Sequence, residues 1–318
     1  MRKLGIQVLL LVFIISLLAA AAGCGETTPQ KLTIGLLPIE DALPFFVAEE
    51  KGYFREAGVE VELEIFKSAV ERDGAFQAGR LDGGVADVVA TAAMVQSGLD
   101  VKIISLTVGA TPAEGRFAIL SAPNSNLRTV KDLAGVEIAV SSNSIIEYVT
   151  DQVLTENGLQ PDEIEKIVVP KIPVRYELLM NGKVQAATLP DPLAALAEAE
   201  GANLVADDTK AKNNYSQVVI LFTGTAVKNK ERAIEKMLDA YERAVREINA
   251  NPESFRELLV SKARVPEKII ETYQVTHFAL PQVPQVKEVE MVIHWMQAKG
   301  LLEKPVAYDD LVEDKFVR

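Results

Sequence analysis

The stretch VEIAVSSNSIIEYVTDQVLTENG, residues 136–158, contains the pattern that decides the fold class. Its first five residues, 136–140, are typical of a short buried strand. Four polar residues follow, and helical periodicity then runs from Ser144 to Asn157 and ends at Gly158. Glycine just past the last turn is the expected left-handed end of a helix. The stretch therefore predicts one strand–loop–helix unit of an α/β protein.

Similar units are predicted on both sides of this stretch. Further strands are expected at 32–36, 59–66, 84–90, 101–107, 116–121, 167–169, 184–189, 203–206 and 217–222. Residues 59–66 alternate strictly between apolar residues and glutamates, which indicates a strand with one face in water. Helices are expected at 174–181 and 193–200, each followed by glycine. Strands and helices that alternate at this spacing predict mostly parallel sheets flanked by helices.

The last third of the chain is predicted to be helical. Apolar residues between Ala233 and Ile248 recur at helical spacing and form one long amphipathic face. Further helices are expected to open at Pro252 and Pro266, and a fourth covers 286–299. We expect this part to form a helical cap over one half of the protein.

The pattern of residues at the N-terminus is typical of an export signal. Arg2 and Lys3 precede an uncharged apolar run over 6–22, and small residues then lead directly to Cys24, the single cysteine. This order predicts a signal peptide over residues 1–23. The cysteine after small residues resembles the bacterial lipoprotein signal, which implies lipidation of Cys24 and a lipidated linker over 24–30. A buried free cysteine and an uncleaved membrane anchor are the alternatives.

Length and charge limit the class of protein. Without residues 1–23 the chain has 295 residues, which suits two lobes better than one core. It then has 31 basic and 45 acidic side chains, a net charge of −14. Such an acidic body argues against nucleic acid as a partner and against a membrane contact other than the lipid anchor. We expect a monomer at the extracytoplasmic face of the cell membrane, without disulfides.

The motifs of covalent and metal-assisted catalysis are absent from the sequence. The chain has two histidines, His277 and His294, and neither belongs to a metal-binding pattern such as HExxH. It also lacks the GxSxG turn of serine hydrolases and the glycine-rich turns that bind phosphates. The sequence thus predicts no enzyme activity, no catalytic residue, no metal and no cofactor.

The order of several segments resembles one large family, the substrate-binding proteins of nitrate, sulfonate, taurine and thiamine-precursor ABC importers. The likeness spans about residues 31–250. The matching segments are LTIGL at 32–36, FFVAEEKGYF at 45–54, VEVEL at 59–63, AGRLD at 78–82, VAD at 85–87, VKDLAG at 130–135, EIAV at 137–140, NGKVQAA at 181–187 and PDP at 190–192.

This resemblance implies two α/β lobes of the type II periplasmic-binding-protein fold, joined by two crossing strands. The crossings are expected near Arg116–Ser121 and Gln217–Phe222. Lobe I would then comprise residues 31–117 and 218–318, and lobe II residues 118–217. The resemblance also implies that a ligand is held between the lobes, which close about the hinge.

Candidate ligand-binding residues follow from a rule for open parallel sheets, in which ligands lie beyond the carboxyl ends of the strands. In lobe I the rule selects Ile39, Glu40, Asp41, Ala42, Ser68 and Asp87. In lobe II it selects Ser141, Ser142, Asn143, Arg175 and Asp191. The acidic members favour an amine or a hydrogen-bonding heterocycle. The polar run at 141–144 opens a helix, and the start of a helix favours an oxyanion.

The sequence therefore predicts a receptor that captures a small polar organic solute, such as an aminosulfonate, another sulfonate-like compound or a nitrogen heterocycle. Its partners would be an ABC permease and the ATPase of that importer. A sensory binding protein for a membrane receptor and a non-transport enzyme on the same fold are the alternatives.

Overall fold

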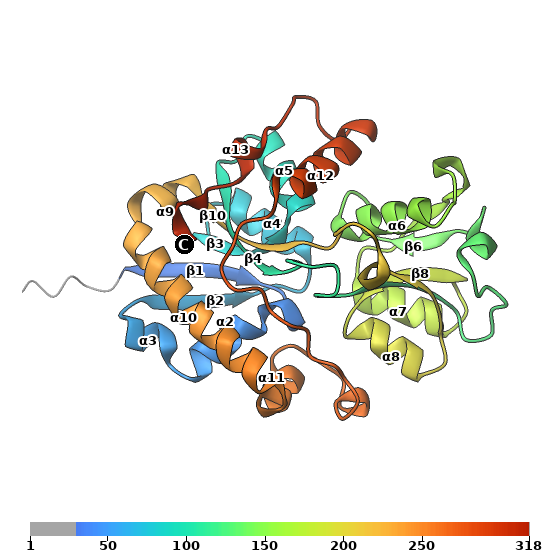
Figure 1. Ribbon diagram of the computed structural model, residues 1–318, viewed down its shortest axis with the longest axis horizontal. Helices are drawn as coiled ribbons and strands as arrows, with labels where there is room; N and C mark the ends of the chain where they lie inside the picture. The colour runs from blue at the N-terminus through green and yellow to red at the C-terminus, as the bar shows by residue number, and fades with distance from the viewer. Residues whose placement is uncertain (1–29, 318) are drawn as a thin grey trace, which may run out of the picture. The chain divides into compact units, whose positions relative to one another are not determined.

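The computed structural model describes residues 30–317. The predicted signal peptide, Cys24 and nearly all of the predicted linker therefore lie outside the described residues. From Lys31 onward the chain forms one compact unit. Within this unit lie two five-stranded sheets, each flanked by helices (Figure 1).

The first sheet has the strand order β2-β1-β3-β10-β4. Its strands are β1 (Lys31–Leu36), β2 (Glu60–Ile65), β3 (Gly83–Asp87), β4 (Val101–Val108) and β10 (Val218–Thr223). Strand β1 pairs in parallel with β2 and β3, whereas β10 runs antiparallel to both β3 and β4. The sheet is therefore mixed, and its antiparallel strand comes from much later in the chain.

The second sheet repeats this arrangement in the order β7-β6-β8-β5-β9. Its strands are β5 (Phe117–Ser121), β6 (Ile138–Val140), β7 (Lys166–Val168), β8 (Ala186–Pro190) and β9 (Asn203–Asp207). Here β6 pairs in parallel with β7 and β8, and β5 runs antiparallel to β8 and β9. The chain passes between the sheets twice, through residues 109–116 and 208–217.

Helices lie between the strands and after β10. The α-helices are α2 (Leu43–Glu50), α3 (Tyr53–Ala57), α4 (Ala69–Gln77), α5 (Val88–Gln96), α6 (Ile145–Glu156), α7 (Ile172–Met180), α8 (Leu193–Ala199), α9 (Gly224–Asn229), α10 (Glu231–Ala250), α11 (Arg256–Ser261), α12 (Val286–Ala298) and α13 (Tyr308–Leu311). Short 3-10 helices are η1 (Glu40–Ala42), η2 (Val130–Leu133), η3 (Pro161–Glu163), η4 (Asp208–Lys210), η5 (Pro252–Phe255), η6 (Glu267–Ile269) and η7 (Asp314–Phe316).

Most predicted elements are confirmed, with boundaries shifted by a few residues. The strand predicted over 84–90 ends at Asp87, because this residue caps α5 by accepting a hydrogen bond from the Ala90 amide at 2.8 Å. The helix predicted from Pro266 is only the short η6, and no helix follows before α12. Prolines within residues 270–285 remove backbone donors and disfavour a helix there.

Strand β2 corrects a second expectation. Its alternating apolar face is only partly covered, and Ile65 remains 45% exposed. The reason is position, because β2 is an edge strand with a single neighbour, β1. The alternation identified the strand correctly but did not indicate how deeply it would be buried.

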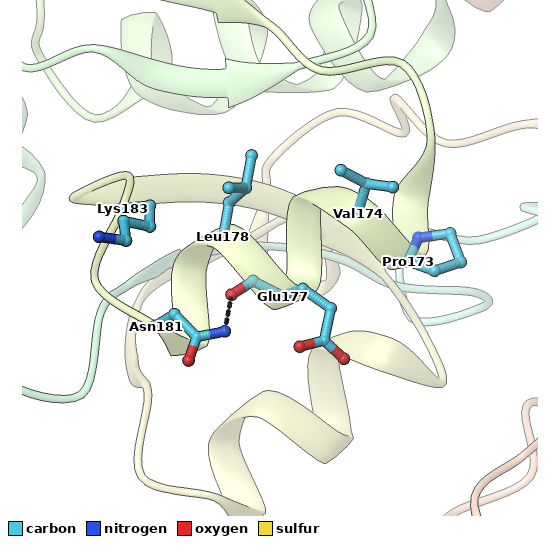
Figure 2. Close-up of a pocket in the computed structure, with 6 residues that line it drawn as sticks. All are labelled: Pro173, Val174, Glu177, Leu178, Asn181 and Lys183. Atoms are coloured by element: carbon cyan, nitrogen blue, oxygen red, sulfur yellow. Dashed lines mark hydrogen bonds between the residues drawn. The ribbon is translucent and has the colours of Figure 1, made fainter.

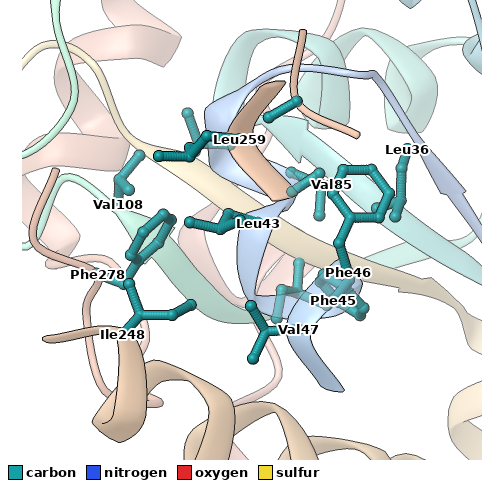
Figure 3. Close-up of a cluster of buried hydrophobic side chains, with 14 of the residues drawn as sticks. Leu36, Leu43, Phe45, Phe46, Val47, Val85, Val108, Ile248, Leu259 and Phe278 are labelled. Atoms are coloured by element: carbon teal, nitrogen blue, oxygen red, sulfur yellow. The ribbon is translucent and has the colours of Figure 1, made fainter. Parts of the chain in front are cut away.

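Helix α10 provides the longest buried helical face and packs against α2 and α3. All the apolar positions predicted between Ala233 and Ile248 are buried. The rings of Phe45 in α2 and Tyr241 in α10 lie 5.0 Å apart. Figure 3 shows Phe45 within this buried cluster, together with Leu43 and Ile248. The cluster holds η1, and with it two candidate carboxylates, against the first sheet.

Candidate functional site

The structure places the predicted residues where strands of both sheets end. Ile39 and η1 follow β1, and Ser68 and Asp87 cap the helices after β2 and β3. In the second sheet, residues 141–143 follow β6 and Asp191 follows β8. Arg175 lies in the first turns of α7, after β7. The rule about carboxyl ends of strands therefore selects positions at corresponding edges of the two sheets.

Glu40 is buried and fixed by the C-terminal part of the chain. The Tyr273 hydroxyl donates to Glu40 Oε2 at 2.7 Å, and the Thr276 amide donates to Oε1 at 2.9 Å. Burial raises the pKa of Glu40 to about 8, although both hydrogen bonds act in the opposite direction. The negative charge of Asp191 contributes to the increase. Thr276 Oγ1 also accepts the Gly115 amide at 2.8 Å, and the next residue, Arg116, pairs with Asp191, so a short series of contacts links the two acids.

Asp41 and Asp87 form a second group of acids on the first sheet. Burial raises the pKa of Asp41 to about 7, and the charge of Asp87 adds to the shift. Burial also raises the pKa of Asp87 to about 6. The Arg72 guanidinium lowers both values but does not cancel the effect of burial. One oxygen of Asp41, Oδ1, is buried without a hydrogen-bond partner, and it is available to a donor on a ligand.

Asp191 is the acid of the second sheet. Its Oδ1 accepts from the Ala195 amide at 3.0 Å and lies 3.6 Å from Arg116 Nη1. Burial raises the pKa of Asp191 to about 6, against the opposing charge of Arg116. Arg116 stands in the first crossing between the sheets and also pairs with Glu198 at 2.6 Å. Asp191 thus shares its cation with another carboxylate.

Arg175 is buried under the polar loop after β6 and supports it. This side chain is fully buried, and its Nη1 donates to Ser141 Oγ at 3.0 Å and to the Val169 carbonyl at 2.7 Å. Its Nε and Nη2 are buried without partners, and burial lowers its pKa to about 10. Ser142 and Asn143 are exposed, and Asn143 adopts a positive φ of 54°. The loop presents polar groups outward, while Arg175 supports it.

The remaining predicted residues have simpler surroundings. Ser68 Oγ accepts the Glu71 amide at 3.3 Å, as expected of a helix cap. The Ile39 carbonyl accepts the Ala42 amide at 3.2 Å and closes the turn that carries Glu40 and Asp41. These residues shape the edge of the first sheet and contribute no charge.

The balance of charge at these edges is negative. Arg72 donates to Asp73 at 2.7 Å and Arg116 contacts Glu198, whereas Arg175 below the second sheet's loop keeps Nε and Nη2 without partners. The four acids Glu40, Asp41, Asp87 and Asp191 all have raised pKa values, so ionising them costs free energy in the unliganded protein. A cation or a strong hydrogen-bond donor reduces that cost.

Sequence reasoning missed four residues that position the acids: Arg72, Arg116, Tyr273 and Thr276. Arg116 is the first residue of the strand predicted over 116–121, where the first crossing was expected, and this position was the signal available for it. Tyr273 and Thr276 lie more than 230 residues from Glu40 and fall in a segment without regular structure. No local pattern indicates such a contact.

A hollow of about 450 Å³ lies elsewhere, on the outer face of α7 (Figure 2). It is lined by Pro173, Val174, Glu177, Leu178, Asn181 and Lys183. None of these is a predicted site residue. Across residues 30–317, no group of three or more His, Cys, Asp or Glu side chains is arranged to hold a metal ion. None of the helices within the same range combines the length and apolar character of a membrane span.

Two mixed sheets joined by two crossings, with β10 returning to the first sheet, form the fold of the periplasmic binding proteins. Over 91% of this chain, the structure matches the alkanesulfonate-binding protein SsuA of Xanthomonas axonopodis pv. citri bound to MOPS, with a TM-score of 0.77 at 20% identity and 99% coverage of that protein. The aliphatic sulphonate-binding protein SsuA of Escherichia coli gives a TM-score of 0.75 at 20% identity, over 89% of this chain and 97% of that one.

The chain belongs to the family described as NMT1/THI5 like, whose model matches residues 40–255. It is 23% identical over 262 residues to a putative periplasmic binding protein of an ABC transporter from Brachyspira hyodysenteriae, covering 77% of this chain and 73% of that protein. It is 28% identical over 145 residues to a putative aliphatic sulfonates-binding protein of Bacillus subtilis, covering 42% of each chain.

One structural neighbour is an enzyme. The desulfurization enzyme DSZB matches with a TM-score of 0.65 at 17% identity, over 90% of this chain and 97% of the enzyme. The fold alone therefore does not separate binding from catalysis. The two relatives described above are named as putative binding proteins, one of an ABC transporter and one for aliphatic sulfonates.

Proposed function

We propose that this protein is a lipid-anchored extracytoplasmic receptor that captures a small polar organic solute and delivers it to an ABC permease and its ATPase. The observation that carries the proposal is the approach of carboxylates from both sheets. Glu40 and Asp191 belong to different sheets, yet Thr276 donates to Glu40 and accepts the Gly115 amide, and the next residue, Arg116, pairs with Asp191. A ligand that contacts both groups would hold the two halves together.

We assign lobe I to residues 31–117 and 218–318, and lobe II to residues 118–217. In this scheme the open form admits the solute, and contacts from both lobes then stabilise the closed form that the permease recognises. The scheme needs no chemical change of the solute, because the additional contacts that the ligand makes in the closed form are enough to favour that form. The ratio of the ligand's affinities for the closed and open forms therefore sets how far binding shifts the protein toward the closed form.

The solute in this proposal contains a basic or hydrogen-donating nitrogen. The raised pKa values of Glu40, Asp41, Asp87 and Asp191 favour such a group, and the exposed loop at 141–143 supplies polar contacts for its other end. An aminosulfonate and a nitrogen heterocycle both satisfy this condition. A simple alkanesulfonate, with only an anionic end, offers no hydrogen-bond donor to these four acids.

The test is a thermal-shift titration with three groups of compounds: aminosulfonates, nitrogen heterocycles and simple alkanesulfonates. We expect a nitrogen-containing compound to raise the melting temperature, and Asp87→Asn or Asp191→Asn to weaken its binding at least tenfold, or about 1.4 kcal/mol. The matched control is Asp239→Asn, an exposed acid on α10. Stabilisation by simple alkanesulfonates alone would contradict the proposed ligand class.

The lipid anchor needs a separate test because Cys24 lies outside the described residues. We expect the mature protein to fractionate with membranes and to begin at an acylated Cys24, as mass spectrometry of its N-terminal peptide would show. Replacement of Cys24 by alanine should release the protein or block its processing. A wild-type N-terminal peptide with a free thiol would refute the anchor.

A further inference from the structure

Helix α12 connects elements that belong to both sheets. Apolar residues of α12, among them Val289 and Met296, are buried, and the helix packs against α5, which itself packs on β3 and β4 of the first sheet. Trp295 and the capping residue Lys299 lie at the C-terminal end of α12. In Figure 1, α12 lies beside α5 and on the side of the molecule where α6 covers the second sheet.

The C-terminal end of α12 bonds to α6. Trp295 Nε1 donates to Asp151 Oδ2 at 3.0 Å, and Lys299 Nζ lies 2.6 Å from Glu147 Oε1 and 3.6 Å from Asp151 Oδ2. Glu147 and Asp151 are four residues apart on α6 and therefore face the same way. The ring of Tyr148 also meets the ring of Trp295 edge-on, with centroids 5.3 Å apart. Helix α6 packs on β5, β8 and β9, so these contacts reach the second sheet.

The N-terminal end of α12 bonds to the crossings instead. Gln217 Nε2 donates to Glu288 Oε2 at 2.5 Å, and Asn214 Nδ2 donates to Glu288 Oε1 at 3.3 Å. Gln217 Nε2 also lies 3.2 Å from the carbonyl of Gly109, in the other crossing. One end of α12 is thus tied to the hinge and the other end to α6. A rotation of the second sheet about the crossings that separates α6 from α12 would break the bonds at Trp295 and Lys299, together with the packing of α6 on α5.

We propose that Trp295 and Lys299 form a latch that holds α6 against α12 and favours the closed arrangement of the two lobes before any ligand binds. The acids of the latch are shielded, with side-chain exposures of 7% for Glu147 and 15% for Asp151. Charges in such surroundings interact more strongly than exposed ones. The latch would raise affinity for a solute without contacting it, because it increases the fraction of protein that is competent to bind.

The chain contains a matched control for this latch. Lys166, in β7, also pairs with both acids, with its Nζ 2.5 Å from Asp151 Oδ1 and 3.3 Å from Glu147 Oε1. Lys166 and α6 both belong to the second sheet and its helices. Lys166→Met therefore removes the same charge from the same acids and leaves the bonds between α6 and α12 in place.

The experiment compares the unliganded wild-type protein with Lys299→Met and Lys166→Met by small-angle X-ray scattering. We expect Lys299→Met to enlarge the radius of gyration and to shift the ratio of closed to open protein about tenfold. Lys166→Met should keep the wild-type radius, and Lys299→Arg should restore it in part. Trp295→Phe serves as a second variant, since it removes the indole N–H and retains an aromatic ring.

Two outcomes would overturn the latch. One is a wild-type radius of gyration in both Lys299→Met and Trp295→Phe. The other is an equal expansion in Lys299→Met and Lys166→Met, which would show that only the charge balance of α6 matters. Because no solute is added, either outcome concerns the latch and leaves the proposed ligand class untouched.

Discussion

Burial has the largest effect on the pKa of each acid in the candidate site. Glu40 accepts two hydrogen bonds, from Tyr273 and Thr276, yet its pKa is about 8 because the loss of water outweighs them. Asp41 and Asp87 show the same balance even though Arg72 is nearby. A positively charged group or a hydrogen-bond donor on a ligand would lower the free-energy cost of ionising these buried acids. The burial of these acids therefore supports the proposed nitrogen-containing ligand.

The first prediction concerns Glu40 and pH. Its pKa is about 8 in the folded protein against an ordinary value of 4.5, so the folded protein binds this proton more tightly than the unfolded chain does. Stability therefore falls as the pH rises between these values, by at most about 1.4 kcal/mol per pH unit for one proton. Chemical denaturation at pH 6, 7 and 8 measures this slope. Glu40→Gln should flatten it, and an unchanged slope would show that Glu40 is not the group responsible.

The second prediction compares a buried with an exposed arginine. Arg72 is 3% exposed and pairs with Asp73, so Arg72→Met should cost about 3 kcal/mol of stability and raise the pKa of Asp41 and Asp87 further. Arg80 is 58% exposed and pairs with Glu64, so Arg80→Met should cost less than about 1 kcal/mol. Urea unfolding measures both. Equal losses would mean that burial does not decide the strength of these pairs.

At the scale of elements, the packing of α2 and α10 fixes the position of η1. Phe45 is fully buried, and the centroid of its ring lies 5.0 Å from that of Tyr241. This contact lies directly behind the turn that carries Glu40 and Asp41. The packing of the apolar cluster and the placement of the acids are therefore linked.

The third prediction follows from this contact. Phe45→Ala should destabilise the protein by about 3–5 kcal/mol, because it removes a large buried side chain and leaves a cavity. Phe45→Leu should cost less, since it keeps most of the buried volume. Denaturant unfolding of the two variants provides the comparison. A Phe45→Ala variant with wild-type stability would contradict the assigned packing.

Local patterns predicted most of these elements. The strand–loop–helix unit at 136–158 reappears as β6, the polar loop and α6, and the apolar stripe after Ala233 reappears as the buried face of α10. The exposure of Ile65 was not predictable in the same way. Alternation reports the conformation of a strand, whereas burial depends on whether the strand lies at the edge of its sheet.

At the level of the whole molecule, the chain leaves the first sheet after β4 and returns to it as β10, so two crossings join the halves that carry the candidate residues. Arg116 ends the first crossing and pairs with Asp191 because the next residue, Phe117 of β5, lies opposite Pro190 of β8 in the second sheet. The sequence predicted which strand ends carry polar residues, because that depends on local order. It did not predict the partners of those residues. Trp295 and Asp151 are 144 residues apart, and only the folded chain brings them together.

The proposal that the protein binds a solute without altering it has one most direct test. Mass spectrometry should identify the compound that co-purifies with the protein, and calorimetry should then measure its rebinding to the emptied protein at pH 6 and pH 8. We expect a nitrogen-containing compound, recovered with unchanged mass, that binds more tightly at pH 8, where a larger fraction of the four acids is ionised than at pH 6. Recovery of a chemically altered compound, or a pure alkanesulfonate that binds equally at both pH values, would contradict the account.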